Sequence, residues 1–360
     1  MTTERFEESR PQPQSSQPSQ PTQKLQTQGG ARNLGALLQE FGQTRIAIEN
    51  ELAKVVVGQK DVIRQILAAV FTRGHCLLEG VPGLAKTLTV STLAKILDVK
   101  FQRVQFTPDL TPSDITGATV LEEDGQGRRS FRFVEGPVFT NILLADEINR
   151  TPPKTQSALL QAMQEREVTV GNETRPLPEP FLVIATQNPL GSAGTQLLPE
   201  SQVDRFMVSL SMGYPDEASE IRMAKARSAG LRTARGGAEA APVIGGAAFL
   251  EIQKEAAETY VHDRVYEYIM ALIAATRKAP GVLRGASPRA TIALTRCAKA
   301  SAWLKGREYA LPEDVAEQFL YVTAHRLLLE RQTKADGETA RGILGHILAE
   351  VPAPGLGASR

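Results

Sequence analysis

The feature that most constrains this chain is an eight-residue loop, GVPGLAKT, at residues 80–87. The short apolar segment before it, residues 75–79, predicts a strand, and the periodic segment after it, residues 84–97, predicts a helix. Glycines let backbone N–H groups turn toward an anion, and a helix N-terminus adds partial positive charge. This context predicts a phosphate-binding loop in an α/β fold, with a chance glycine-rich turn as the alternative.

Two side chains of the loop have predicted chemical roles. Lys86 would reach the β- and γ-phosphates of a nucleotide, and Thr87 would place its hydroxyl on Mg²⁺. The loop departs from the usual pattern at Ala85, because glycine normally precedes the lysine. That position leads into a helix, so we expect alanine to be accepted there. The predicted nucleotide contacts of this segment are Gly80, Val81, Pro82, Gly83, Leu84, Ala85, Lys86, Thr87 and Leu88.

A second signal is the run ILLADE, in which four apolar residues precede Asp146 and Glu147. In a parallel sheet, ligands bind at the carboxyl ends of the strands. Asp146 would hold Mg²⁺ through water, and Glu147 would polarise the attacking water. Neighbours on a strand point in opposite directions, so the two acids can divide these roles. The alternative is a solvated acidic turn after the strand. The phosphate-binding loop predicted at residues 80–87 argues strongly against that alternative.

Three further polar residues are candidates on weaker local signals. Asn188 ends the apolar segment FLVIATQN, where its amide would orient the lytic water or contact the γ-phosphate, or simply form a turn before proline. Arg205 would stabilise transition-state charge across a subunit boundary, or pair with a nearby acid on the surface. Arg289 lies in the first turn of a helix that Ser287 and Pro288 would begin, where it would meet an anion or face solvent.

The order of segments predicts an α/β unit with a parallel sheet flanked by helices, followed by a smaller, all-helical domain. We expect strands at residues 75–79, 101–106, 141–146 and 181–186, and helices at 84–97 and 153–164. Residues 229–248 are rich in Gly and Ala and predict a loose linker. The expected divisions are a Gln-, Pro- and Ser-rich disordered tail at 1–32, the α/β domain at 33–213, the helical domain at 214–350 and a flexible end at 351–360.

Charge and cysteine content exclude several classes of protein. The 41 basic and 40 acidic residues leave a formal charge of +1. The overall charge therefore does not favour binding to a nucleic-acid backbone. The two cysteines, Cys76 and Cys297, have no zinc-finger spacing and predict buried thiols in a reducing cytoplasm. No apolar run approaches the roughly 20 residues that a membrane span needs. We therefore expect a cytoplasmic protein without a membrane span.

Together these motifs resemble those of the AAA+ ATPases, and most closely the MoxR family. The resemblance covers residues 45–340. The segment LEGVPGLAKT resembles that family's Walker A loop, Ala85 included, and ADEINR resembles its Walker B motif. The segments QFTPDL, ATQNP and LPESQVDRF are also typical of it.

The resemblance implies a role for each candidate by position. Asn188 matches sensor 1, Arg205 the arginine finger that acts on a neighbouring subunit, and Arg289 sensor 2. Val57 and Gly58 match the segment beside the adenine. ATP and Mg²⁺ are the implied cofactors.

Two inserts and a ring are also implied. Residues 117–136 match the helix-2 insert and residues 168–174 the hairpin before sensor 1. A finger that serves a neighbour's site requires a heterologous, closing interface, and the family implies six subunits. A glycine-containing connection near residues 211–216 would let the helical domain rotate as a lid while ATP turns over. Arg289 would sense the γ-phosphate and transmit that motion.

The main functional expectation is an ATP-driven chaperone that remodels or matures protein complexes, together with a separate von Willebrand factor A-domain protein. The alternatives are a nucleic-acid motor, a magnesium-chelatase-like motor subunit and a nucleotide-gated scaffold. The presence of Glu147 and Arg205 argues against the scaffold, and the charge balance argues against the nucleic-acid motor.

Overall fold

The structure is a computed structural model that describes residues 34–81, 83–123, 125, 127–188, 198–228 and 240–355. The predicted disordered tail at residues 1–32 lies outside the described residues, and so does Pro82 of the loop.

A five-stranded parallel sheet forms the centre of the N-terminal part, in the order β2-β5-β8-β1-β9. Its strands are β1 (Cys76–Glu79), β2 (Phe101–Gln105), β5 (Ile142–Asp146), β8 (Leu182–Gln187) and β9 (Val208–Ser211). This confirms the predicted fold class. The three central strands, β5, β8 and β1, are almost entirely buried, as expected for strands covered on both faces.

Alternation along the strands divides the sheet between two hydrophobic cores. Leu143 and Val183 pack on one face with helix α5 (Pro153–Glu165). Leu144 and Ile184 pack on the other face with the remaining large helices. The helices of this part are α1 (Leu34–Val55), α2 (Lys60–Phe71), α3 (Lys86–Ile96), α4 (Pro112–Thr116), α5, α6 (Glu200–Val203) and the 3₁₀ turn η1 (Ile148–Arg150).

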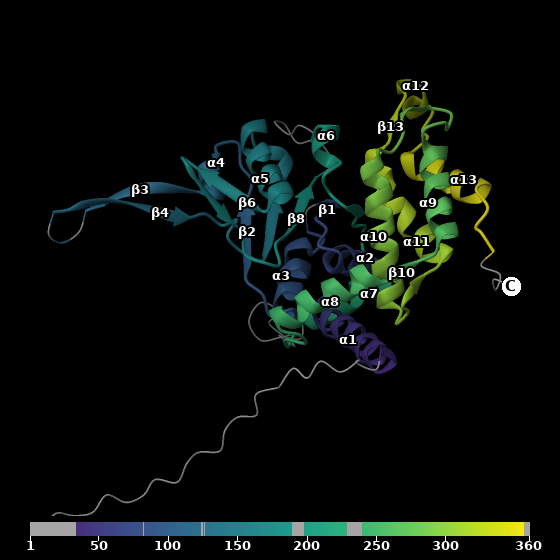
Figure 1. The fold of residues 1–360 in the computed structure, drawn as a ribbon, viewed down its shortest axis with the longest axis horizontal. Helices are drawn as coiled ribbons and strands as arrows, with labels where there is room; N and C mark the ends of the chain where they lie inside the picture. Colours follow the sequence, from purple (N-terminus) through teal and green to yellow (C-terminus); the bar gives the residue numbers. More distant parts are fainter. Residues whose placement is uncertain are drawn as a thin grey trace, which may run out of the picture.

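Two antiparallel hairpins extend from this α/β unit. The first pairs β3 (Gly117–Glu123) with β4 (Arg129–Glu135) and projects far from the body (Figure 1). The second pairs β6 (Glu167–Val170) with β7 (Glu173–Pro176). Both lie where the two inserts were expected.

The C-terminal part is mainly helical. Its helices are α7 (Glu217–Ser228), α8 (Gly246–Glu258), α9 (Asp263–Thr276), α10 (Pro288–Leu304), α11 (Pro312–Thr323), α12 (Arg331–Ala335), α13 (Ala340–Glu350) and the 3₁₀ turn η2 (Ala324–Arg326). Periodicity predicted only helices, but the structure adds two short ladders between their ends. They pair β10 (Tyr260–Val261) with β12 (Tyr309–Ala310) and β11 (Val282–Arg284) with β13 (Leu328–Leu329). The predicted linker is also shorter than expected, because α8 begins at Gly246.

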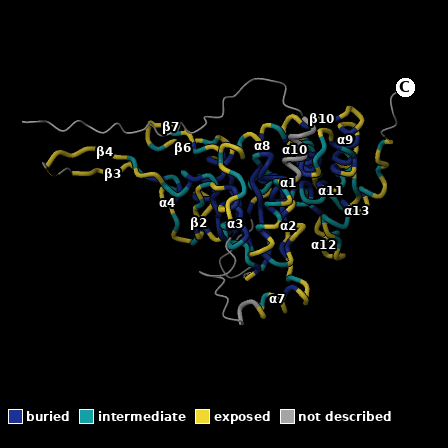
Figure 2. The backbone as a smooth tube through the Cα atoms, turned by 90° about the horizontal axis from the view of Figure 1, so that it is seen from below, coloured by how far each residue is buried: buried dark blue, intermediate teal, exposed yellow. Residues whose placement is uncertain are grey.

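The helical part packs tightly against the α/β part. Phe71 at the end of α2 makes edge contacts with Phe249 of α8 and Trp303 of α10, at ring-centroid distances of 5.7 and 5.6 Å. One continuous hydrophobic core joins the two parts. Figure 2 shows buried backbone in both of them. Rotating the helical part about residues 211–216 would open this core to water. The expected rotation of the helical domain during ATP turnover stays a prediction, and it would have to rearrange this packing.

Candidate functional site

The carboxyl edge of the sheet collects most of the predicted site. β5, β8 and β1 are neighbours, and they end at Asp146, Gln187 and Glu79. Gln187 donates from Nε2 to Oε1 of Glu79 at 2.6 Å, which joins the ends of β8 and β1. The loop at 80–87, the acidic pair and Asn188 therefore lie along one edge, as the strand order predicts.

The loop at residues 80–87 turns through two left-handed positions. Gly83 has φ +91, and its missing Cβ would meet no atom within 4 Å. Ala85 has φ 57 and ψ 21 and precedes the first residue of α3. The reason we gave for accepting alanine is therefore wrong, because this residue is not helical. A left-handed alanine costs roughly 1–2 kcal/mol, which is why glycine is usual there.

Lys86 begins α3 and points back over its own loop. Its Nζ donates to the carbonyl oxygen of Gly80 at 2.6 Å. Burial lowers the pKa of Lys86, while the negative charges of Asp146 and Glu147 raise it in opposition. The ammonium group thus lies within electrostatic reach of both acids. Thr87 is the next residue of the helix and is partly buried.

Asp146 is a buried carboxylate with partners on both oxygens. Thr186 of β8 donates its hydroxyl to Oδ1 at 2.6 Å. Arg103 of β2 donates to Oδ2 from Nη2 at 2.7 Å and from Nε at 3.1 Å. The strands on either side of β5 therefore hold this carboxylate in place.

Glu147 leaves the sheet in a left-handed conformation, with φ 57. Its backbone N–H donates to Oγ1 of Thr186 at 2.8 Å. Its Oε2 accepts from Nε2 of Gln105 at 2.9 Å and from Nη1 of Arg150 at 2.6 Å. A strained backbone and two side-chain donors fix this carboxylate beside Asp146.

The segment at Val57 and Gly58 lies against the start of α7. Gly58 has φ +79, and a Cβ there would come within 3.1 Å of Pro215 and 3.2 Å of Ser219. Gln59 donates from Nε2 to the carbonyl oxygen of Gly213 at 3.0 Å. Glycine is therefore required at this crossing.

These donors fit a nucleotide with Mg²⁺. The loop offers an ammonium group and a helix N-terminus for phosphates, and the edge offers a hydroxyl and carboxylates for a hard cation. Among the described residues, no three His, Cys, Asp or Glu side chains gather into a metal site. Mg²⁺ binds proteins through one or two carboxylates together with substrate phosphates and water.

Arg205 and Arg289 lie at the opposite edge of the sheet. Both line a cavity of about 320 Å³ that Gly74 and His75, just before β1, and Met207, just before β9, also line. β1 is four residues long, so roughly 10 Å or more of strand separates this amino edge from the phosphate loop. The structure therefore brings the two arginines together but does not bring either to Lys86.

The cavity is strongly basic. Besides Asp204, every charged residue that lines it is an arginine, and one histidine, His75, lines it as well. The arginines are Arg73, Arg166, Arg205, Arg289, Arg296 and Arg326. Such a cavity offers positive potential to an anion.

Asp204 contacts two of the arginines that line the cavity at the amino edge of the sheet. It accepts from Nε of Arg326 at 2.8 Å, and Nη1 of Arg289 lies 3.6 Å away. Arg326 is itself buried and also donates to the carbonyl oxygen of Phe206 at 2.7 Å. Nε of Arg205 is buried, and no described residue bonds it. The pairing of Arg205 with a nearby acid is therefore not seen, since Asp204 binds other arginines.

His75 is a structural residue of the core. The backbone N–H of Val183 donates to its Nδ1 at 2.9 Å, and its Nε2 lies 3.0 Å from the carbonyl oxygen of Met163. Burial is the main cause that lowers its pKa to about 4. Cys76 is equally buried, and burial raises the pKa of its thiol. Both ring nitrogens of His75 have backbone partners, so neither is available to bind a metal ion.

Several residues that contribute to the two edges were not predicted as site residues. Gln105, Arg103 and Arg150 hold the acidic pair, and Arg166 and Arg326 line the basic cavity. Arg103 and Gln105 lie two residues apart on β2, whose sequence resembles that of many strands. Their contacts with the acidic pair arise only because β2 pairs with β5. Arg326 is distant in sequence from Asp204, and only folding joins them.

Two family models match the chain. The model for the ATPase family associated with various cellular activities (AAA) matches residues 75–208, and that for the AAA lid domain matches residues 274–347. None of the described helices is long and apolar enough to cross a membrane.

Similar proteins cover most of the chain. The Chaperone MoxR1 of Mycobacterium tuberculosis is 39% identical, over 92% of this chain and 86% of that protein. The Protein MoxR of Methylorubrum extorquens is 33% identical, over 82% of this chain and 90% of that protein. A crystal structure of a candidate ATPase from Cytophaga hutchinsonii is 42% identical, with a TM-score of 0.81, and covers 88% of this chain and 97% of that one.

Proposed function

The chain belongs to the MoxR family of AAA+ ATPases, and we propose that it hydrolyses ATP at sites shared between neighbouring copies in a ring. AAA+ domains bind nucleotides. What we propose beyond nucleotide binding is that this chain uses Mg²⁺, that it hydrolyses ATP and that two copies share each site. The proposed divisions are the nucleotide-binding domain at residues 33–213 and the lid at 214–350.

The carboxyl edge would bind and activate the substrate. The loop N–H groups and Lys86 would bind the phosphates, while Thr87 and Asp146 would hold Mg²⁺. Bound Mg²⁺ would neutralise phosphate charge. Glu147 would accept a proton from the attacking water, oriented by Asn188. Val57 and Gly58 would border the adenine, and the close approach of Gly58 to Pro215 and Ser219 fixes the position of this segment.

The amino edge would complete the site of the next copy. Arg205 and Arg289 share one cavity, at the far end of β1 from the phosphate loop. This single observation supports the proposal most strongly, because neither arginine can serve its own loop without a large rearrangement. We therefore assign both to the neighbour's γ-phosphate, which changes the role expected for Arg289. A surface that completes a different surface of the next copy generates a closed ring, here proposed to contain six.

The product of this cycle would be mechanical work on partner proteins. The relative named Chaperone MoxR1 supports a chaperone role. We propose remodelling or maturation of protein complexes in the cytoplasm, with a von Willebrand factor A-domain protein as partner.

The test is ATP turnover per chain against protein concentration, with Glu147→Gln as the background. A shared site predicts turnover that rises with concentration to a plateau and that is absent in the variant. Turnover at the level of the variant throughout, despite measurable ATP binding, would contradict hydrolysis by the chain alone.

A further inference from the structure

A second hollow lies beside the arginine cavity, between α8, α9 and α10. Its volume is about 580 Å³, and we call it the lid groove. Apolar surface from Ala256, Ala257, Tyr266 and Ile292 lines it. Ile292 is 61% exposed and Tyr266 is 41% exposed, so both leave apolar surface open to solvent in the groove.

Every charged side chain that lines the lid groove is basic. These are Arg73, Lys254, Arg296 and Lys299. Burial lowers the pKa of Lys299, whose Nζ donates to the carbonyl oxygen of Ala257 at 2.8 Å. Lys254 already pairs with Glu251 on the exposed surface at 2.8 Å, so an incoming carboxylate would share that cation. The basic lining still favours an apolar segment with carboxylates around it.

Two buried polar atoms in the lining have no hydrogen-bond partner among the described residues. Gln253 is 2% exposed, and its Nε2 donates to the carbonyl oxygen of Val70 at 2.8 Å. No described residue donates to its Oε1. Oγ1 of Thr291 in the same lining is also without a partner. Both atoms are covered by protein atoms, so the polar groups beneath the groove are incompletely hydrogen-bonded.

The start of α7 has the complementary composition. Tyr214 is 75% exposed and Ile221 is 46% exposed. Asp216, Glu217 and Glu220 lie on the same short segment. Within the described part of the chain, the carboxylates of Glu217 and Glu220 form no ion pair. Residues 214–221 are thus an exposed acidic and apolar segment, which we call the α7 segment.

The two surfaces cannot meet within one chain. Figure 2 shows α7 standing out from the body on the other side from α8 and β10. The α7 segment packs on Gly58, at the proposed nucleotide border. The lid groove shares Arg73, Ile292 and Arg296 with the cavity that contains Arg205 and Arg289. An edge that reaches the neighbour's nucleotide therefore also brings the lid groove near the neighbour's α7.

We propose that the lid groove binds the α7 segment of the next copy in the ring. This inference rests on the proposed head-to-tail ring and names the contact that fixes its register. Tyr214 and Ile221 would cover the apolar lining, and Glu217 and Glu220 would pair with Lys254 and Lys299.

The first test is disulfide cross-linking of the full chain. Two variants, Ile221→Cys and Ile292→Cys, are mixed with ATP under mild oxidation. The native thiols are both buried, so they should not compete. The proposal predicts a cross-linked dimer in the mixture and far less in either variant alone. Leu283→Cys, an equally exposed lid position outside the groove, is the control partner for Ile221→Cys and should give none.

The second test is charge reversal, read out by sedimentation. Glu217→Lys with Glu220→Lys should weaken association on the order of tenfold or more, and so should Lys254→Glu with Lys299→Glu. Mixing the two double variants should restore assembly, because an alternating ring then pairs every groove with an α7 segment of opposite charge. Combining all four changes in one chain should restore assembly as well. Lys334→Glu with Lys278→Glu, on the lid away from the groove, is the matched control and should assemble normally.

These readouts do not depend on ATP hydrolysis. Cross-linking and charge rescue without turnover would support the contact and contradict the proposed enzyme. Turnover that depends on concentration, with no specific cross-link and no effect of charge reversal, would overturn the contact alone. A chain that stays monomeric in all conditions would overturn both, and binding of a different protein to the groove in the assembled ring would overturn the contact.

Discussion

The position of the Glu147 carboxylate depends on donors from two other segments. Gln105 reaches it from the end of β2, and Arg150 reaches it from η1. The backbone itself is held in a left-handed conformation by Thr186. A proposed base held in this way has little freedom, so small changes around it should affect the chemical step more than binding.

Gln105→Met should lower ATP turnover about tenfold while nucleotide affinity stays unchanged. The change removes one of the two donors to Glu147 and leaves the phosphate loop intact. Steady-state kinetics and a fluorescent nucleotide titration would measure the two effects separately. Gln161→Met, which removes a glutamine bonded to Glu165 on the exposed face of α5, is the control. Equal turnover in both variants would contradict the positioning role.

His75 should make the fold sensitive to mild acid. Burial lowers its pKa to about 4, against 6.5 for an unperturbed histidine. The unfolded chain therefore binds a proton between these values that the folded chain does not, so stability is complete above pH 6.5 and falls toward pH 4. Between pH 7.5 and 5 the loss should be about 2 kcal/mol from this residue.

Urea unfolding at the two pH values would measure that loss. His75→Gln should reduce the difference between them, although its own stability will be lower. His346→Gln, at an exposed position, should keep the wild-type difference. An unchanged pH dependence in His75→Gln would show that protonation of other groups controls acid sensitivity.

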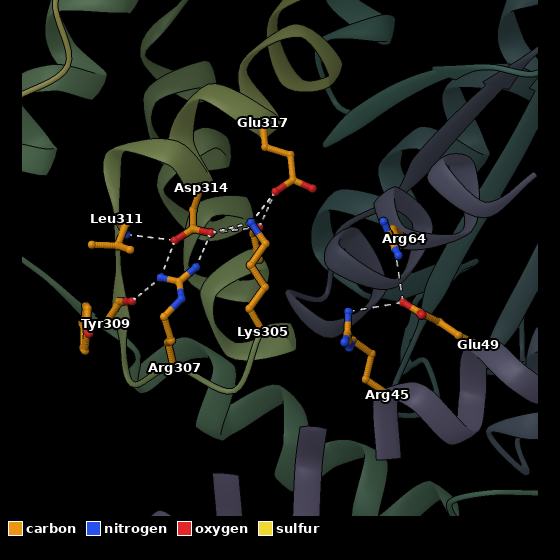
Figure 3. Close-up of polar contacts among 10 residues, drawn as sticks. Arg45, Glu49, Arg64, Lys305, Arg307, Tyr309, Leu311, Asp314 and Glu317 are labelled. Carbon is orange, nitrogen blue, oxygen red and sulfur yellow. Dashed lines mark hydrogen bonds and ion pairs between the residues drawn. The ribbon is translucent and has the colours of Figure 1, made fainter. Parts of the chain in front are cut away.

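At the scale of elements, the first turn of α11 is organised by one buried carboxylate (Figure 3). Asp314 accepts from the backbone N–H of Leu311 at 2.9 Å, from Arg307 at 2.7 and 2.8 Å and from Lys305 at 2.9 Å. Burial raises the pKa of Asp314, but these hydrogen bonds outweigh it and the pKa lies below its usual value. The carboxylate thus ties the end of α10 to the start of α11.

Asp314→Ala should destabilise the lid by about 3 kcal/mol at neutral pH, because it removes a buried partner from two cations and the cap of a helix. Glu317→Ala is the matched control. That carboxylate bonds Lys305 at 2.5 Å but is 37% exposed, so its loss should cost less than about 1 kcal/mol. Thermal unfolding of both variants would test this, and equal losses would contradict the role of burial.

Most elements could be predicted from local pattern alone. The strands at β1, β5 and β8 were predicted within one residue, because continuous apolar runs next to turn residues mark central parallel strands. The short ladders β10–β12 and β11–β13 could not be predicted. They are two or three residues long and are made by helices that happen to end side by side.

At the scale of the whole molecule, the sequence predicted the positions of some candidate residues and not those of others. Lys86, Asp146 and Glu147 are fixed by one sheet, so their order along the chain was enough. Arg289 belongs to a helix whose position depends on how the lid packs against Phe71, and that contact is distant in sequence. Its place beside Arg205 could not be predicted from spacing, and the lid rotation that the family resemblance implies stays a prediction.

The central claim is that one site takes its phosphate loop from one copy and its arginines from the next. Two inactive variants, Lys86→Ala and Arg205→Ala, test it most directly. Each alone should lack turnover, since the first cannot bind phosphate and the second cannot complete its neighbour. In an equal mixture, about a quarter of the interfaces would join an intact loop to an intact Arg205 and recover activity. Mixed rings that stay inactive, although the two chains assemble together, would contradict the shared site.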